Sequence, residues 1–224
     1  LGGRAAADVL LPWEVTVRND SAETARDVQV ELREDETVRP GLRIAEIPPG
    51  STIIRRFETR FVRSGGHAVQ ARIASDAVAA DNVRTAAVDV AERIDVLVID
   101  GAGESAGRSG DAFYVSAALA PGAGAATGVR PRVEQPRALA TLDLAAFAGI
   151  WLLDVERLDP AEVAAVEAYV RAGGGVVFFM GPRTNAETFN RTLHRGGEGL
   201  FPVALAGPVD LLVDATPNPV PDVV

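Results

Sequence analysis

The chain of 224 residues contains no cysteine. This absence excludes disulfide bonds, thiolate nucleophiles and zinc sites built from cysteine thiolates. It leaves the redox compartment open, because a chain without thiols is stable on either side of a membrane. Lysine is absent as well, so arginine supplies all 22 of the Lys and Arg positions.

Basic residues are few compared with the 31 acidic residues, and the net charge is −9. Sequence-independent binding of nucleic acid relies on a basic face, and docking on anionic lipid relies on a basic patch. The charge balance therefore excludes nucleic acid as an expected partner and gives no reason to expect attachment to a lipid surface.

Long apolar runs are also missing. The longest, Leu144–Leu153, has ten residues, whereas a membrane-spanning helix needs about 20. Residues 1–11 lack the apolar core of a signal peptide. The only methionine is Met180, so we do not expect residue 1 to be a natural start. We therefore expect a piece of a longer protein that does not itself insert into a membrane.

The first ninety residues show the period-two pattern of strands. In residues 27–33, Asp-Val-Gln-Val-Glu-Leu-Arg, apolar and polar side chains alternate strictly, which predicts one buried and one wet face. Short β-rich runs of this kind occur at 13–18, 27–33, 42–47, 52–62, 69–73 and 83–90. Turn-forming residues such as Pro48-Pro49-Gly50 separate them. Six or seven short strands at this spacing predict an antiparallel β-sandwich of the immunoglobulin-like type.

The pattern changes near residue 93. Nearly continuous apolar runs at 94–100, 149–154 and 176–180 are typical of parallel strands covered on both faces. Helical segments are predicted between and after them, at about 109–120, from 159 to 172 and from 184 onward. Strands alternating with helices predict an α/β unit with a mostly parallel sheet.

Two helix starts are marked by capping boxes. Asp159 is expected to cap one helix, with Pro160 in its first position and Glu162 reaching back. Thr184 and Glu187 form the second box. We place the domain boundary at residues 92 and 93, which gives a sandwich over 1–92 and an α/β domain over 93–224. The pattern weakens after Gly207, so the completeness of the second domain stays open.

The carboxyl edge of the predicted parallel sheet is the candidate ligand cleft, because α/β folds place their sites there. The candidate residues are Asp100, Gly101, Glu104, Asp154, Glu156, Met180, Gly181 and Thr184. Their carboxylates could hold Mg²⁺ or Ca²⁺, but strand-end solvation and loop capping explain them more simply. Residues 101–106 fit a Gly-x-Gly-x-x-Ala dinucleotide pattern, yet the loop is too long and no acidic residue follows a clear second strand. We predict no metal and no cofactor.

Nucleophilic chemistry has few candidate residues. His67 is expected at a surface or hairpin position beside two glycines, and His194 at the end of a helix. Thr184 serves better as a helix cap than as a nucleophile. Catalysis by His194 with Thr184 is therefore a minor alternative.

Residues 15–90 resemble a bacterial CARDB-type (cell-adhesion-related) immunoglobulin-like domain. The similarity rests on Val-Arg-Asn-Asp at 17–20, the alternating strand 27–33, Ile-Pro-Pro-Gly at 47–50, Ser-Gly-Gly-His-Ala-Val at 64–69 and Ala-Asp-Asn-Val-Arg at 80–84. Residues 94–205 resemble the class I glutamine amidotransferase-like fold in a degenerate form, on the motifs at 96–101, 166–175 and 176–181. In tandem, the two halves are similar to the C-terminal half of planctomycete-type membrane proteins with a BatA segment and a von Willebrand A domain.

The resemblance implies a flavodoxin- or amidotransferase-like fold without the activity. In active amidotransferases, the strand that corresponds to residues 176–180 ends in a nucleophilic cysteine. Met180 or its neighbour occupies that position in this chain. The downstream His-Glu pair of the active enzymes is also missing. The implied function is a non-enzymatic interaction or scaffold region of a bacterial envelope protein, tethered by segments outside this chain. Its partner would be another protein or the rest of the same polypeptide, including the von Willebrand A domain.

The alternative is a small-ligand-binding or hydrolase-type domain that uses the loops after Asp100, Asp154 and Met180. A concave pocket with converging polar groups would favour this alternative, and a filled edge would favour the interaction module.

Overall fold

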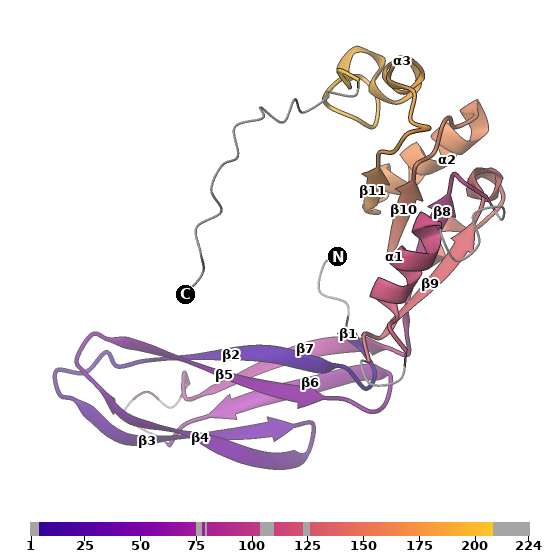
Figure 1. The fold of residues 1–224 in the computed structure, drawn as a ribbon. Coiled ribbons are helices and arrows are strands. Elements are labelled where there is room, and N and C mark those ends of the chain that lie inside the picture. The colour runs from indigo at the N-terminus through magenta and orange to yellow at the C-terminus, as the bar shows by residue number, and fades with distance from the viewer. Residues whose placement is uncertain (1–4, 75–77, 79, 104–109, 123–125, 208–224) are drawn as a thin grey trace, which may run out of the picture.

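The computed structural model describes residues 5–74, 78, 80–103, 110–122 and 126–207. The N-terminal part consists of seven strands in two sheets (Figure 1). A five-stranded sheet has the order β1-β7-β6-β3-β4, and β2 pairs with β5 in a second sheet. The strands are β1 (Ala5–Ala6), β2 (Leu10–Arg18), β3 (Ala25–Glu34), β4 (Thr37–Ile47), β5 (Thr52–Arg60), β6 (Gly65–Arg72) and β7 (Val83–Ala91).

The alternation seen in the sequence places the main core between these two sheets. Val30 and Leu32 of β3 are almost fully buried, together with Ile44 and Ile47 of β4 and Val17 of β2. Full burial of one such side chain contributes about 1.5–3 kcal/mol. These contacts hold the two sheets face to face, as the period-two pattern predicted.

A smaller core closes the end of the sandwich from which the chain leaves. It contains Ala5, Phe61, Val69 and Val90. Ala5 and Ala6 form β1, which runs parallel to the end of β7. The sequence did not indicate this strand, because two alanines carry no β-strand signal.

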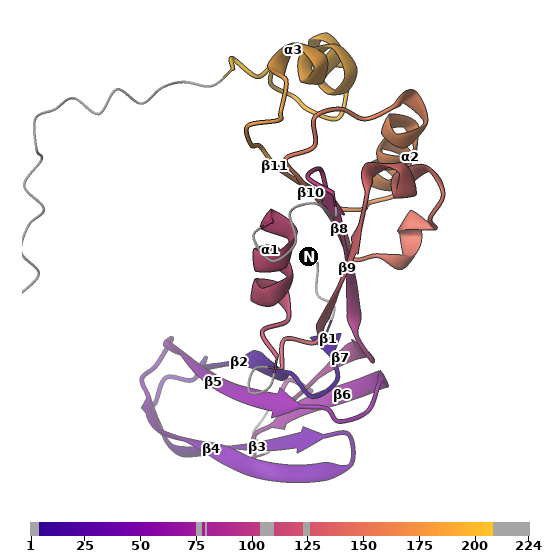
Figure 2. The same ribbon diagram turned by 45° about the vertical axis from the view of Figure 1, so that its right-hand side comes forward.

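The C-terminal part is a four-stranded parallel sheet with the order β11-β10-β8-β9. Its strands are β8 (Ile94–Asp100), β9 (Val129–Glu134), β10 (Gly149–Leu153) and β11 (Val176–Phe179). Helix α1 (Asp111–Leu119) and helix α2 (Pro160–Arg171) lie on opposite faces of the sheet (Figure 2). Two short 3-10 turns, η2 (Pro136–Ala140) and η3 (Leu144–Ala146), connect β9 to β10.

Strand β8 explains why the helices cover both faces. Val96 and Val98 pack with Ala112 of α1, whereas Leu97 and Ile99 pack with α2. All four strand residues have no exposed surface. A strand that is apolar on both faces requires a layer on each side, as the sequence predicted.

The start of α2 confirms the predicted helix signal. Pro160 occupies the first turn, and Glu162 Oε2 accepts a hydrogen bond from Asp159 N at 2.7 Å. This contact satisfies an amide that the helix leaves unpaired.

The second predicted helix start was wrong in its cap. Helix α3 spans only Ala186–Phe189, and its N-cap is Asn185, whose Oδ1 accepts from Thr188 N at 2.9 Å. The chain continues as a π-type turn, η4 (Asn190–His194), and a 3-10 turn, η5 (Arg195–Gly197). Thr184 does not cap this helix, because its hydroxyl is engaged in the preceding loop.

The α/β part stands on one end of the sandwich (Figures 1 and 2). Gly128, just before β9, lies so close to β1 that a Cβ there would overlap the Cβ of Ala6 and lie 2.8 Å from a methyl group of Val9. Nearby, Arg130 donates two hydrogen bonds to Asp95, at 2.5 and 2.7 Å. These bonds lower the pKa of Asp95 and raise that of Arg130. The junction thus has a close contact between Gly128 and Ala6, and an ion pair within the α/β part lies beside it.

Within the described ranges, no helix is long and apolar enough to cross a membrane.

Replacing Gly128 with Ala should loosen this junction. Gly128 has φ +69°, and its Cβ position is occupied by neighbours, so strain and overlap add to a cost of about 2–4 kcal/mol. Gly50→Ala is the matched control, because Gly50 has φ +68° with nothing within 4 Å of the added Cβ. Thermal unfolding should show the larger loss for Gly128→Ala. Equal losses for the two variants would show that Gly128 makes no contact that matters.

Candidate functional site

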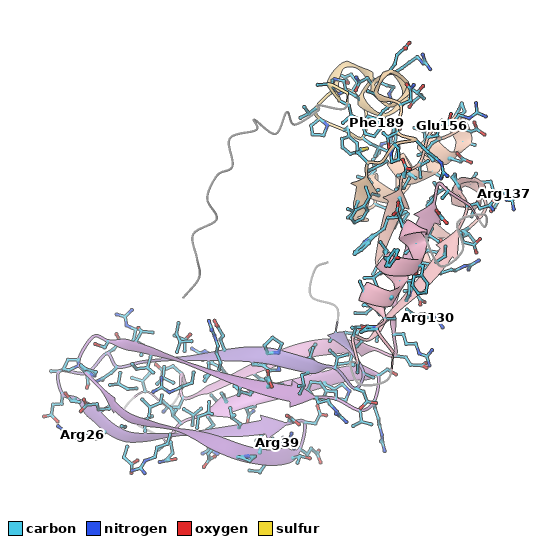
Figure 3. All side chains as sticks on the ribbon, viewed as in Figure 1. Arg26, Arg39, Arg130, Arg137, Glu156 and Phe189 are labelled. Atoms are coloured by element: carbon cyan, nitrogen blue, oxygen red, sulfur yellow. The ribbon has the colours of Figure 1, made fainter. Side chains whose placement is uncertain are left out.

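The carboxyl ends of β8, β10 and β11 form one edge of the parallel sheet. Figure 3 shows Glu156 and Phe189 at this end of the α/β part, far from the sandwich, and Arg130 at the junction. Two of the strand ends meet through backbone hydrogen bonds to β10. Gly101 N donates to Leu153 O at 2.9 Å, and Asp154 N donates to Phe179 O at 2.8 Å.

Asp154 is the centre of this edge. It is buried and has a φ of +44°, a left-handed conformation that Asp and Asn tolerate better than most residues. Its Oδ1 accepts from Arg183 N at 2.8 Å and lies 3.5 Å from Thr184 Oγ1. The carboxylate therefore organises the loop after β11.

Two glycines allow this close arrangement. A Cβ on Gly101 would overlap the carbonyl oxygen of Asp154, and one on Gly181 would lie 2.5 Å from the Asp154 carboxyl carbon. Gly101 therefore serves the packing of two strand ends. Gly101 is part of the dinucleotide-binding pattern found in the sequence, but in the structure its lack of a side chain serves strand packing.

The remaining candidates divide between different contacts. Asp100 Oδ1 accepts from Ala102 N at 2.9 Å, which is a local turn. Glu156, Met180 and Thr184 line a cavity between β11 and α3, together with apolar residues that include Leu158 and Phe189. Glu104 and residues 104–106 of the glycine pattern lie outside the described residues.

The cavity at this edge is small. Its volume is about 20 Å³, close to what one water molecule requires. Asp100, Gly101, Asp154 and Gly181 do not line it. Those predicted cleft residues that the structure describes therefore lie at one end of the sheet, but they do not together line a space that could hold a small organic ligand.

The histidine and threonine of the minor catalytic alternative have separate partners. His194 Nδ1 lies 2.9 Å from Phe201 O, and Thr184 Oγ1 accepts from Gly181 N at 3.1 Å. Among the described residues there is no group of three or more His, Cys, Asp or Glu side chains placed to hold a metal ion.

One polar pair was missed by sequence reasoning. His67 was expected at a surface or hairpin position. In the structure, His67 Nδ1 lies 2.8 Å from Asp35 Oδ2, and the ring is largely buried. The two residues are 32 positions apart, and no local pattern could have joined them.

Among the comparisons with known proteins, the one with solved structures found matches. No family model and no curated protein matches the chain. The solution structure of a CARDB domain from Pyrococcus furiosus is 17% identical over 40% of this chain and 87% of that domain, with a TM-score of 0.38. The crystal structure of that domain in complex with di-metal ions covers 39% of this chain and 79% of the domain, at 17% identity and a TM-score of 0.37. Red sea bream transglutaminase is 15% identical over 39% of this chain and 13% of its own, with a TM-score of 0.35. Each is similar to this chain in the fold of the matched part.

Substitution of Asp154 tests whether its hydrogen-bonding geometry stabilises this edge of the sheet. Asp154→Asn keeps an Oδ1 acceptor and a residue that tolerates positive φ, so it should cost less than about 1 kcal/mol. Asp154→Ala removes both and should cost about 2–3 kcal/mol. Urea unfolding measures both, with Asp100→Ala as a control that should behave like Asp154→Asn. Equal losses for Asp154→Asn and Asp154→Ala would mean that the charge, and not the hydrogen-bonding geometry, stabilises this edge.

Proposed function

We propose that this chain is a non-enzymatic protein-interaction region of a bacterial envelope-associated protein. Its partner would be an extended apolar strand of another protein, added to the outer edge of β11. This proposal includes an amidotransferase-like scaffold, tethering segments outside the chain and a von Willebrand A domain in the same polypeptide.

The hydrogen bonds of the loop after β11 carry the proposal. An acyl-transfer site needs free backbone N–H groups to stabilise an oxyanion. Here Gly181 N donates to Thr184 Oγ1, Arg183 N donates to Asp154, and Thr184 N donates to Gly181 O. Pro182 has no N–H. None of residues 181–184 therefore has a free backbone N–H group that could bind a substrate oxygen.

The two edges of the parallel sheet differ in their protection. β9 carries Pro131 in its middle and the charged residues Arg130, Arg132 and Glu134, which are devices that block pairing with another strand. β11 reads Val-Val-Phe-Phe and has neither proline nor charge. Among the described strands, none pairs with the outer edge of β11. The unprotected edge favours an added strand.

Both faces of β11 offer apolar contacts to such a strand. On one face, Val177 and Phe179 remain 43% exposed, and Phe179 lies 5.5 Å from Trp151, ring centre to ring centre. On the other, a groove of about 190 Å³ is lined by Val176, Phe178, Phe201 and neighbouring apolar residues. A strand with apolar side chains on both faces matches these surfaces.

The strand order supports the same position. Taken along the chain as first to fourth, the strands β8, β9, β10 and β11 lie in the order 2-1-3-4. Flavodoxin-like sheets continue this order with a fifth strand beside the fourth. The partner strand would occupy that fifth position.

Photo-crosslinking tests the partner. A benzophenone amino acid at position 177 should crosslink, in a bacterial envelope extract, to an uncharged apolar segment of another protein. A synthetic peptide of that segment should bind the wild-type chain and bind Val177→Lys at least tenfold more weakly. Val133→Lys on β9 is the matched control and should bind like the wild type. Equal crosslinking from positions 177 and 133, or crosslinks confined to the chain itself, would contradict the proposal.

Activity assays test the alternative function. The purified chain should show no glutaminase or esterase turnover above buffer, and Met180→Ala should change stability and no rate. Turnover that disappears in Thr184→Val or His194→Gln would establish the enzyme and reject the interaction module.

A further inference from the structure

His67 has hydrogen-bond acceptors on both ring nitrogens. Nδ1 lies 2.8 Å from Asp35 Oδ2, and Nε2 lies 2.9 Å from the carbonyl oxygen of Arg63. A neutral imidazole carries one N–H, whereas the imidazolium carries two. Both contacts can be hydrogen bonds at the same time only when the ring is protonated.

Asp35 is held in place independently of the ring. It lies in the turn between β3 and β4 with a φ of +50°. Its backbone N donates to Ala68 O at 2.8 Å, and its Oδ1 accepts from Ala68 N at 2.9 Å. The carboxylate is therefore aimed at His67 by two bonds that do not involve the imidazole.

Among the described residues, the other groups beside the ring are uncharged. Phe61 stacks on it at 4.3 Å, centre to centre, and Val88 of β7 is opposite His67 in register. Asp35 is thus the charged group that faces the imidazole, and the loop of residues 61–64 contributes the Arg63 carbonyl. The hydrogen bond to Asp35 raises the pKa of His67 above its ordinary value of 6.5, with a smaller contribution from Arg63.

The loop 61–64 connects His67 to the junction of the two parts. Phe61 O accepts from Asp8 N at 2.8 Å, close to β1. Val62 lines a cavity of about 560 Å³ together with Arg93, Gly128 and Arg130 of the α/β side. The position of this loop therefore affects the surface between the sandwich and the α/β part.

We propose that His67 is a proton-controlled latch on the loop 61–64. The protonated ring holds the loop through the Arg63 carbonyl, and the neutral ring releases that carbonyl while it keeps its bond to Asp35. A carboxylate is the stronger acceptor, so the remaining proton stays on Nδ1. Loss of the Nε2 proton leaves a lone pair facing the carbonyl oxygen, and the loop moves away from the ring.

The pH window follows from the two shifts. The pKa of His67 is raised, so its contribution to stability is complete below its unfolded value of about 6.5 and disappears as the pH rises through the folded value. The hydrogen bond from His67 lowers the pKa of Asp35, so that contribution is present above about 3.8 and disappears as the pH falls. The latch is therefore closed below the folded pKa of His67, and both contributions to stability are complete between about pH 3.8 and 6.5.

Nitrogen-15 NMR of the whole chain tests the latch. His67 should titrate above pH 6.5 and show the Nδ1–H tautomer at high pH. The amide ¹⁵N signal of Ser64, whose peptide group contains the Arg63 carbonyl, should shift with the same midpoint. His194→Gln is the control variant, because the His194 ring contacts Phe201 O in the α/β part, and this variant should leave the response of Ser64 unchanged.

Two variants complete the test. Asp35→Asn keeps the acceptor for Ala68 N and tolerates positive φ, so it should fold and lower the midpoint of both signals together. His67→Phe keeps an aromatic ring on Phe61 and should hold Ser64 at its high-pH position at every pH. An Nε2–H tautomer at high pH, or a Ser64 signal that does not respond to His67, would overturn the proposal.

Discussion

The two-sided burial of β8 is the constraint on which the C-terminal part depends. A strand with four consecutive residues removed from water on both faces cannot lie at a surface. It requires α1 on one side and α2 on the other, and it requires neighbours along both edges, which β10 and β9 supply. The sheet order then brings the carboxyl ends of β8, β10 and β11 to one edge. There, Gly101 and Gly181 pack closely against Asp154.

That edge is filled by its own chain. In many α/β proteins the loops beyond the strands leave backbone donors for a ligand. In this chain Asp154 and Thr184 take up those donors, and apolar side chains leave room for about one water. In the described part of the parallel sheet, the outer edge of β11 is unpaired and, unlike that of β9, carries no proline or charged residue. Under the proposed function, the closed loop region and the unpaired strand edge together favour an interaction module over an enzyme of similar architecture.

Local patterns in the sequence predicted what depends on local physics. The apolar run at 94–100 identified β8, and Asp159, Pro160 and Glu162 identified the start of α2, because caps and periodicity act within one turn or one strand. Contacts between distant residues left no such signal. Asp35 and His67 meet only because β3 and β6 pair. Leu139 lies in a 3-10 turn and is fully buried, although nothing around it indicated a regular element. Thr184 had a suitable cap position, but its hydroxyl accepts a hydrogen bond from Gly181 N in the loop before the helix.

The pairing of β1 with β7 has a mechanical consequence. The two strands are parallel, with Ala5 beside Val90 and Ala6 beside Ala91. Tension applied between residue 5 and residue 91 pulls them in opposite directions along their length, so the hydrogen bonds are loaded in shear and break together. The pair is only two residues long, so it would yield before the longer ladders of the sandwich. Because Gly128 lies against Ala6, separating β1 from β7 would also remove this contact between β1 and the α/β part.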